Sequence, residues 1–569
     1  MRFFCFFILS FVACVLSYAQ NNEWLNHFGG TNSDNIRMIT YSQSGKLLAI
    51  GTISDSVTFK KGSYDSTFYG INGNNLILQL NPLDGSINWV KQFGKGGSHL
   101  NSMAIDIAKN NTIAIVGSYY GEPDFDPDTG IVHNDSLNYP GLFALKLDSN
   151  GNYIWVKTIK NTTWINSVAH DDNSNIYFTG SYWRTVDFDP GNNIKHLVTL
   201  NPPDGYLCSL DSNGNFRFVR NFRGGGHTNC SNVKYDDNGF LYILGNFQSN
   251  LIAKPNQRRI NGKGGTDIYL TKMDTSGVST WTRHIGGGYG EYGVLMELDY
   301  SGNIYISGLY KDSIDMDPTN AKYYLKGNGN QIQNFFDIFI AKYNSQGYFL
   351  WAKGFGGIGY EYIYAAALDS DNNVYISGIF SDTADFDPST KLNRLIPNGN
   401  NDIFISKFDS LGDYQFTIQY EGQGTGAINS LETDNHDNLI CAGYFIDSVD
   451  FDPGIAKLYK TTAQFGSDLF IQKLNQNSIA VKLFSNPKVI SQKVHAFPNP
   501  TKGSFSIQLN EEYITALVKI RDLTGQLISR KEYSPSNQIN LEINREKGLY
   551  LVELVIDGQD PIYLKIIKQ

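Results

Sequence analysis

The chain has 569 residues and a formal net charge of -9, with 18% charged residues, 14% aromatic residues and 56 Gly. This length exceeds a single ordinary core unless the core is built from repeats, and the abundance of aromatic residues and Gly favours short strands joined by tight turns over disorder or a helical bundle. The acidic balance offers no electrostatic basis for a nucleic-acid partner.

Residues 1–19 have the features of a secretory signal peptide. Arg2 supplies a positive charge, an apolar stretch runs from Phe3 to Leu16, and Ser17-Tyr18-Ala19 is a small-x-small cleavage site. No later stretch reaches the ~18 unbroken apolar residues that a membrane-spanning helix needs. We therefore expect an exported protein with no transmembrane segment after signal cleavage.

A segment of the form Trp-x-x-x-Phe-Gly-Gly recurs about every 65 residues along the next part of the chain. Its aromatic landmarks are Trp24, Trp89, Trp155, Phe218, Trp281, Trp351 and Phe416. Each unit contains four strand-like runs bounded by Gly, Asn and Asp turns. The pattern predicts an all-β fold, with residues 20–485 forming a seven-bladed β-propeller. Because a lone fourth strand around Trp24 precedes the first complete unit, we expect that strand to complete the last blade.

Two pieces of the repeat are distinctive. Residues 302–308 read Gly-Asn-Ile-Tyr-Ile-Ser-Gly, and residues 449–454 read Val-Asp-Phe-Asp-Pro-Gly. They resemble the β-propeller repeats of large exported bacterial proteins, and the resemblance extends from residue 24 to about residue 485. It implies the fold and carries little information about function.

Five units contain a pair of aspartates separated by one apolar residue and followed by Pro. In an extended segment both carboxylates of a pair lie on one face, where they repel each other unless backbone amides or a cation compensate. We interpret the pairs as turn caps, and the alternative is that their hard oxygen ligands bind Ca²⁺. No other cofactor is expected. The ten residues are Asp124, Asp126, Asp187, Asp189, Asp315, Asp317, Asp385, Asp387, Asp450 and Asp452.

One face of the predicted ring carries the long connections, which join fourth strands to first strands and second strands to third strands. We call it the long-loop face, and the opposite side the short-turn face. Long irregular loops on a rigid scaffold are where recognition usually occurs, and aromatic rings are effective contact residues. The candidate ligand-binding residues there are Trp164, Trp183, Arg184, Tyr289, Glu291, Tyr360 and Glu361.

The repeat ends near Phe484, and after a linker at 486–494 the composition changes. Residues 495–507 include a Pro-Asn-Pro opening, residues 522–525 read Asp-Leu-Thr-Gly, residues 548–550 read Gly-Leu-Tyr, and the chain ends in a basic strand. These features resemble the type A C-terminal sorting domain of the type IX secretion system of Bacteroidota. The resemblance implies a small Ig-like β-sandwich over residues 495–569 that directs the protein across the outer membrane, leaving it secreted or attached to the outer cell surface.

The predicted function is a surface-displayed or secreted, adhesin-like binding module that recognises protein or glycan through the long-loop face. Its expected partner for export is the type IX secretion machinery. The alternatives are a polysaccharide-acting enzyme, either a glycosidase or a lyase, and a purely structural surface component. The sequence contains none of the usual local hydrolase, metalloprotease or phosphate-loop motifs, so we assign no catalytic residue and favour binding over catalysis.

Overall fold

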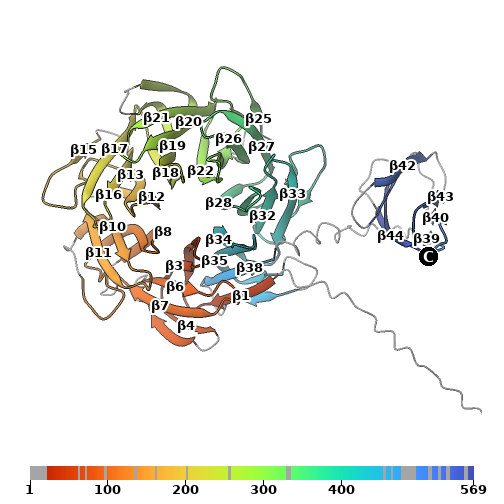
Figure 1. The fold of residues 1–569 in the computed structure, drawn as a ribbon, viewed down its shortest axis with the longest axis horizontal. Helices are drawn as coiled ribbons and strands as arrows, with labels where there is room; N and C mark the ends of the chain where they lie inside the picture. Colours follow the sequence, from red (N-terminus) through yellow and green to blue (C-terminus); the bar gives the residue numbers. More distant parts are fainter. Residues whose placement is uncertain are drawn as a thin grey trace, which may run out of the picture. The chain divides into compact units, whose positions relative to one another are not determined.

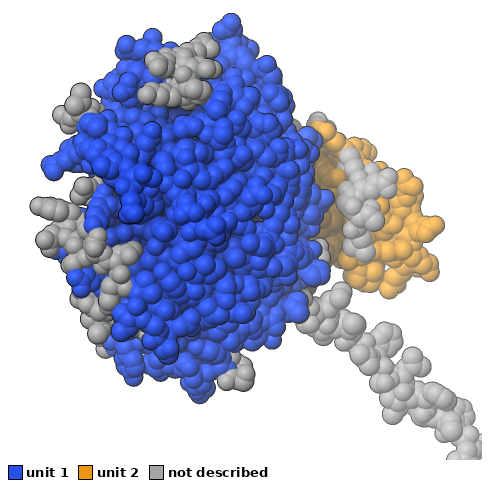
Figure 2. Space-filling model, turned by 60° about the vertical axis from the view of Figure 1, so that its left-hand side comes forward, with its two compact units in different colours: residues 1–480 blue, residues 481–569 orange. Residues whose placement is uncertain are grey.

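The computed structural model describes residues 22–61, 64–70, 74–94, 99–132, 137–160, 163–199, 203–253, 258–327, 335–452, 457–462, 466–475, 495–509, 516–522, 527–533, 538–556 and 562–569. Every regular element in these ranges is a strand, which confirms the all-β fold class. The predicted signal peptide and the linker at 486–494 lie outside them. The chain forms two compact units, residues 1–480 and 481–569 (Figure 2).

In the described part of the first unit, seven sets of four antiparallel strands follow one another around a ring, and we number them as blades 1 to 7 (Figure 1). Blade 1 is β2 (Asn35–Tyr41), β3 (Leu47–Ile53), β6 (Asn74–Leu80) and β7 (Ile87–Phe93); blade 2 is β8 (His99–Ile107), β9 (Ile113–Gly121), β10 (Leu137–Leu147) and β11 (Tyr153–Ile159). Blade 3 is β12 (Thr163–His170), β13 (Ile176–Tyr182), β16 (Asp204–Leu210) and β17 (Phe216–Gly224); blade 4 is β18 (Thr228–Tyr235), β19 (Phe240–Ala253), β20 (Arg258–Asp274) and β21 (Ser279–Gly287).

The ring continues with blade 5, formed by β22 (Glu291–Leu298), β23 (Ile304–Tyr310), β26 (Asp337–Tyr343) and β27 (Phe349–Gly357). Blade 6 is β28 (Glu361–Leu368), β29 (Val374–Phe380), β32 (Asp402–Phe408) and β33 (Tyr414–Tyr420), and blade 7 is β34 (Thr425–Thr433), β35 (Leu439–Ile446), β38 (Asp468–Leu474) and β1 (Asn22–Phe28). The first strand of each blade lies innermost (Figure 1).

Short hairpins project between the second and third strands of several blades. They are β4 (Ser56–Lys61) with β5 (Tyr64–Tyr69), β14 (Thr185–Asp187) with β15 (His196–Val198), β24 (Ser313–Asp315) with β25 (Tyr324–Lys326), β30 (Ala384–Asp385) with β31 (Arg394–Leu395), and β36 (Ser448–Asp450) with β37 (Tyr459–Thr461). They belong to the long-loop face.

The two ends of the ring are joined by backbone pairing. β1 pairs antiparallel with β38, from Asn22 opposite Leu474 to Phe28 opposite Leu469. Trp24 and Phe28 of this strand are buried in the core between blades 7 and 1. The N-terminal strand is thus the outer strand of the last blade, as its place in the repeat predicted.

The hydrophobic core of the ring lies between the blades. Each of seven clusters of buried residues takes its members from two neighbouring blades, so a blade's two faces are both covered. The landmark aromatic residues of blades 1 to 5 and of blade 7 also pack on the turn between the third and fourth strands of the next blade. Trp351, for example, donates its indole N–H to Ser410 O at 3.1 Å and lies against Gly412, whose positive φ of 82° suits Gly.

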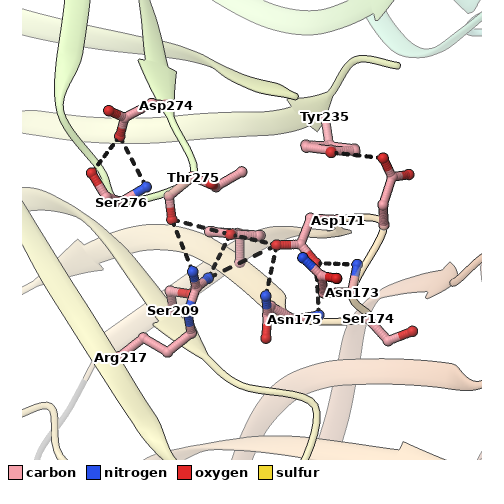
Figure 3. Close-up of polar contacts among 12 residues, drawn as sticks. Asp171, Asn173, Ser174, Asn175, Ser209, Arg217, Tyr235, Asp274, Thr275 and Ser276 are labelled. Carbon is pink, nitrogen blue, oxygen red and sulfur yellow. Dashed lines mark hydrogen bonds and ion pairs between the residues drawn. The ribbon is translucent and has the colours of Figure 1, made fainter. Parts of the chain in front are cut away.

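Aspartates shape the turns on the short-turn face. Asp171 Oδ1 accepts hydrogen bonds from the amides of Asn173 and Asn175, both at 2.9 Å, and its Oδ2 accepts from Tyr177 (Figure 3). Arg217 of the same blade donates to Thr275 O in blade 4, so the capped turn also ties two blades together. These turns are hairpin connections in which Asp and Asn satisfy the backbone.

The second unit is a small sandwich of two sheets. One sheet has the order β39 (His495–Phe497), β40 (Ser504–Gln508) and β43 (Gln538–Glu542); the other has the order β42 (Leu527–Tyr533), β41 (Ala516–Arg521), β44 (Gly548–Ile556) and β45 (Ile562–Lys568). A single core cluster joins them, with Ile507 and Ile539 from the first sheet and Val518 and Val552 from the second. All four side chains are essentially inaccessible to solvent.

Candidate functional site

The paired aspartates of the long-loop face cap their own loops. The first Asp of each pair accepts two backbone N–H groups through Oδ1: Asp187, for example, accepts from Asp189 at 3.2 Å and Lys195 at 2.7 Å. The same arrangement occurs at Asp124, Asp315, Asp385 and Asp450. The apolar residue between the two acids is fully buried in every copy: Phe125, Phe188, Met316, Phe386 and Phe451.

Most of the second acids of these pairs cap the residues that follow, as Asp126, Asp189, Asp317 and Asp387 show. Two of the first acids also pair with Lys, since Lys322 Nζ lies 2.6 Å from Asp315 Oδ2 and Lys457 Nζ lies 3.0 Å from Asp450 Oδ2. Among the described residues, no three His, Cys, Asp or Glu side chains converge as a metal site would require. These contacts support the capping interpretation, while Ca²⁺ binding stays a prediction to be tested.

Chelation and substitution separate the two interpretations. Asp187→Ala should lower the free energy of unfolding by about 1–3 kcal/mol because two amides lose their acceptor, and Asp189→Ala by about 1 kcal/mol because one does. Thermal melts with and without EDTA should coincide for the wild type and both variants. A Ca²⁺-dependent shift that is present in the wild type and absent from both variants would contradict the capping interpretation.

The candidate contact residues fall into two groups. Trp164, Trp183, Tyr289 and Tyr360 are all more than 40% exposed, and the guanidinium of the exposed Arg184 lies 5.9 Å from the Trp183 ring. Glu291 and Glu361 are 0% and 1% exposed, so their carboxylates do not project into solvent. They begin β22 and β28, where adjacent residues face opposite sides of the strand, and their tyrosine neighbours take the exposed side.

Strand register reveals a set of residues that sequence inspection missed. In every blade, a Gly of the second strand pairs with the first-strand residue that lies just before a β-bulge. The first-strand residue immediately before that paired residue therefore has the same register position in all seven blades. We call these residues the mouth ring: Asn35, Asn101, Trp164, Asn229, Tyr292, Tyr362 and Ala427. They place three amides, three aromatic rings and one Ala, all uncharged, near the long-loop end of the first strands.

Part of the mouth ring lines a hollow of about 560 Å³. None of the described residues that line this hollow is charged: they are Asn166, Asn229, Ser231, Asn232, Asn246, Tyr292, Gly293, Val294, Leu309, Phe336, Tyr360 and Tyr362. Polar contacts hold its wall across blades 4 and 5. Asn246 Oδ1 accepts the Gly293 amide at 2.7 Å, and Ser231 Oγ donates to Gly293 O at 3.0 Å.

The aromatic side of the hollow is pre-arranged by ring contacts. The rings of Tyr360 and Tyr362 are stacked, with centroids 6.2 Å apart and an interplanar angle of 12°. Tyr362 also lies 5.0 Å from Tyr364, and Tyr292 meets Phe336 edge-on at 5.7 Å. Tyr292 and Tyr360 remain 38% and 42% exposed, so each presents part of its ring to solvent.

A second hollow, of about 620 Å³, lies on the short-turn face among the turns that join first strands to second strands, and its lining contains charged residues. Lys234 Nζ lies 2.8 Å from both carboxylate oxygens of Glu297, and Asp106 Oδ2 lies 2.9 Å from His170 Nδ1. Burial raises the pKa of Glu432, which also lines this hollow, to about 8, with Lys234 opposing the shift. Sequence inspection did not single out this charged cluster, because its members come from five different blades.

The second unit has the strand order and the Pro-Asn-Pro entry described above, and its sequence decides its role. Residues 495–569 match the secretion system C-terminal sorting domain. The protein is therefore exported by the type IX secretion system and is released or attached to the cell surface. In the described residues, no helix is long and apolar enough to cross a membrane.

Comparisons of the whole chain are less specific. An uncharacterised WD repeat-containing protein of Acanthamoeba polyphaga mimivirus is 28% identical over 203 residues, which is 32% of this chain and 14% of that protein. A crystal structure of a protein of unknown function from Bacteroides caccae shares 8% identity with a TM-score of 0.29, covering 64% of this chain and 93% of that one. The chain thus matches a small part of the curated relative's length.

Proposed function

We propose that this exported protein is a recognition module whose seven-bladed ring binds neutral glycan at the mouth ring on the long-loop face. In this proposal residues 1–19 are the signal peptide, residues 20–485 carry the binding activity, residues 486–494 are a linker, and residues 495–569 serve export alone. The observation that carries the proposal is the uncharged hollow of about 560 Å³ walled by amides on one side and stacked tyrosines on the other.

The chemistry of this hollow suits a sugar. Aromatic rings present flat apolar faces to the C–H groups of a pyranose, while Asn and Ser side chains and exposed backbone groups exchange hydrogen bonds with its hydroxyls. A polyanionic or polycationic ligand would instead need compensating charges, which the described lining does not contain. Binding is favoured over hydrolysis because glycosidases act through a pair of carboxyl groups beside the sugar, whereas the acids next in sequence to the tyrosines of this hollow, Glu291 and Glu361, are buried.

A glycan array probed with the full mature chain tests the proposal. We expect binding to one class of uncharged oligosaccharide, and we expect Tyr292→Ala and Tyr362→Ala each to weaken it by about tenfold or more, as for central aromatic contacts elsewhere. Tyr459→Ala is the matched control, because Tyr459 is 52% exposed on the outer hairpin strand β37 and should leave affinity unchanged. A blank array together with capture of a defined surface protein that requires Tyr292 would replace glycan by protein as the ligand.

A further inference from the structure

On the long-loop face, the same pair of buried acids occurs at three of the boundaries between neighbouring blades, and we call each of these boundaries a seam. An acid on the third strand of one blade lies beside an acid at the start of the first strand of the next. The pairs are Asp468 with Asp34, Asp267 with Glu291, and Asp337 with Glu361, and every one of these residues is at most 5% exposed. Two like charges in one buried seam cannot both ionise cheaply.

The first Gly of the Gly-Gly segment leaves the space that the third-strand acid occupies. A Cβ on Gly286 would lie 1.8 Å from Asp267 Oδ1, and one on Gly356 would lie 2.3 Å from Asp337 Oδ1, so a side chain at the first Gly would displace the third-strand acid. The amide of Gly287, which follows Gly286, donates a hydrogen bond to Glu291 Oε2 at 3.0 Å. The loop is therefore built around the acid pair.

The seams differ in whether a His of the fourth strand lies beside the third-strand acid. His27 Nε2 lies 2.7 Å from Asp468 Oδ2, and His284 Nε2 lies 3.2 Å from Asp267 Oδ1. In blade 5 the corresponding fourth-strand position is Gly354, so no His stands at this place in that seam. Both carboxylate oxygens of Glu361 are buried without a hydrogen bond of good geometry among the described residues, and the nearby Gly357 amide offsets only part of the rise in the pKa of Glu361.

The pKa of the acid at the start of the first strand differs among the three seams. Burial raises the pKa of Asp34 to about 6, that of Glu291 to about 7 and that of Glu361 to about 8. The charged groups that act on Glu361 are Asp337 from β26 and Asp382 from the loop after β29, and both oppose its ionisation. Glu291 faces Asp267 and Lys263, both from β20, and the lysine offsets part of the effect.

These acids alternate with the aromatic residues of the hollow. Tyr360 and Tyr362 flank Glu361, and Tyr292 follows Glu291. Because successive residues of a strand point to opposite sides, the buried acid anchors the same few backbone atoms from which the exposed tyrosines project. A carboxylate forced to ionise in the seam must gain water or move, and its strand end moves with it.

We propose that Glu361, assisted by Glu291, is a positioning residue that holds the tyrosines of the mouth ring in place while it is protonated and releases them when it ionises. Ligand binding at the mouth should therefore be switched off by rising pH. The functional consequence rests on the proposed glycan-binding function, whereas the conformational step does not. No titration at Tyr or at the ligand is required.

The direction follows from proton binding. The folded chain keeps a proton on Glu361 up to a pH of about 8, whereas an unfolded chain loses it near the ordinary value of 4.5. The protonated anchor is thus fully stabilising below pH 4.5, and that stabilisation is lost as the pH rises through 8. For Glu291 the corresponding loss is complete above a pH of about 7.

Hydrogen exchange of the full mature chain measures the conformational step without any ligand. Between pH 6 and pH 9, after correction for intrinsic exchange rates, protection of a peptide spanning residues 357–364 should fall about tenfold in the wild type and less than about twofold in Glu361→Gln. Glu421→Gln is the matched control, since Glu421 is a more exposed acid in the loop after β33 and should keep the wild-type response. If the Glu361→Gln variant does not fold, Glu361→Thr replaces it, because blade 4 has Thr228 at this register position.

The outcomes separate the two proposals. Equal loss of protection in the wild type and Glu361→Gln overturns the switch, whatever the glycan array shows. A blank array with a pH response that Glu361→Gln abolishes overturns glycan binding and leaves the switch in place. If a glycan binds, its dissociation constant should rise about tenfold from pH 6 to pH 9 in the wild type and stay constant in Glu361→Gln; the same rise in the variant would count against the switch.

Discussion

A mature chain that begins at residue 31 instead of residue 20 will lose most of the stability of its ring. The deletion removes β1, which supplies the whole outer strand of blade 7 and leaves the edge of β38 unpaired. It also removes Trp24 and Phe28, which are 6% and 7% exposed and fill the core between blades 7 and 1. A propeller avoids exposed sheet edges by closing, so this deletion opens the ring within blade 7, where the two ends of the ring are joined by the pairing of β1 with β38.

Single substitutions give the size of the effect. Trp24→Ala should lower the free energy of unfolding by about 3–5 kcal/mol, because it leaves a cavity and removes the indole hydrogen bond to Pro82 O. Trp183→Ala is the control: this residue is 44% exposed, and the change should cost at most about 0.5 kcal/mol. Urea unfolding of the shortened chain and of both variants gives the comparison.

Two results would contradict closure by β1. Unchanged stability of the chain that begins at residue 31 would show that the other blade interfaces hold the ring without it. A similar loss from Trp24→Ala and Trp183→Ala would show that the indole of Trp24 has no special place in the core. Dimerisation of the shortened chain would support closure, because the exposed edge of β38 can pair with a second copy.

The strands and the closure of the ring could be predicted from the sequence because both depend on local, repeated signals. Landmark residues such as Trp24 and Trp351 pack on the turn of the next blade, and the turns need Gly, Asn and Asp for their backbone geometry. Each unit therefore repeats the same sequence signals. A fourth strand that precedes the first complete unit is then expected to pair with the third strand of the last blade. The capping aspartates were predictable for the same reason, since their acceptors and donors lie in one loop.

The site was harder to predict because it depends on which side of a strand each residue faces. A glutamate in a loop-like sequence predicts an exposed carboxylate, yet β22 and β28 begin at Glu291 and Glu361, and both side chains are buried. A β-bulge in each first strand changes the side to which the residues around it point. The mouth ring can therefore be recognised only by aligning the blades on the second-strand Gly that pairs with the residue just before the bulge. The alignment needs only the sequence once the pairing is known.

Ending the chain before residue 495 should leave the protein in the periplasm. Residues 495–569 match the sorting domain and have a hydrophobic core of their own, so we expect their removal to take away the export signal and leave the ring folded. We expect fractionation and protease treatment of intact cells to show full loss of surface and medium protein, with a periplasmic pool that melts at the same temperature as the wild type.

Transfer of the domain provides the matched control for that truncation. Fusing residues 486–569 to an unrelated periplasmic reporter should carry the reporter to the surface or the medium, because the linker and sorting domain then supply the whole signal. Surface delivery of the truncated chain would mean that the ring itself is recognised by the secretion machinery. If the truncated protein is periplasmic but melts at a lower temperature, the sorting domain also stabilises the ring, and its role is not confined to export.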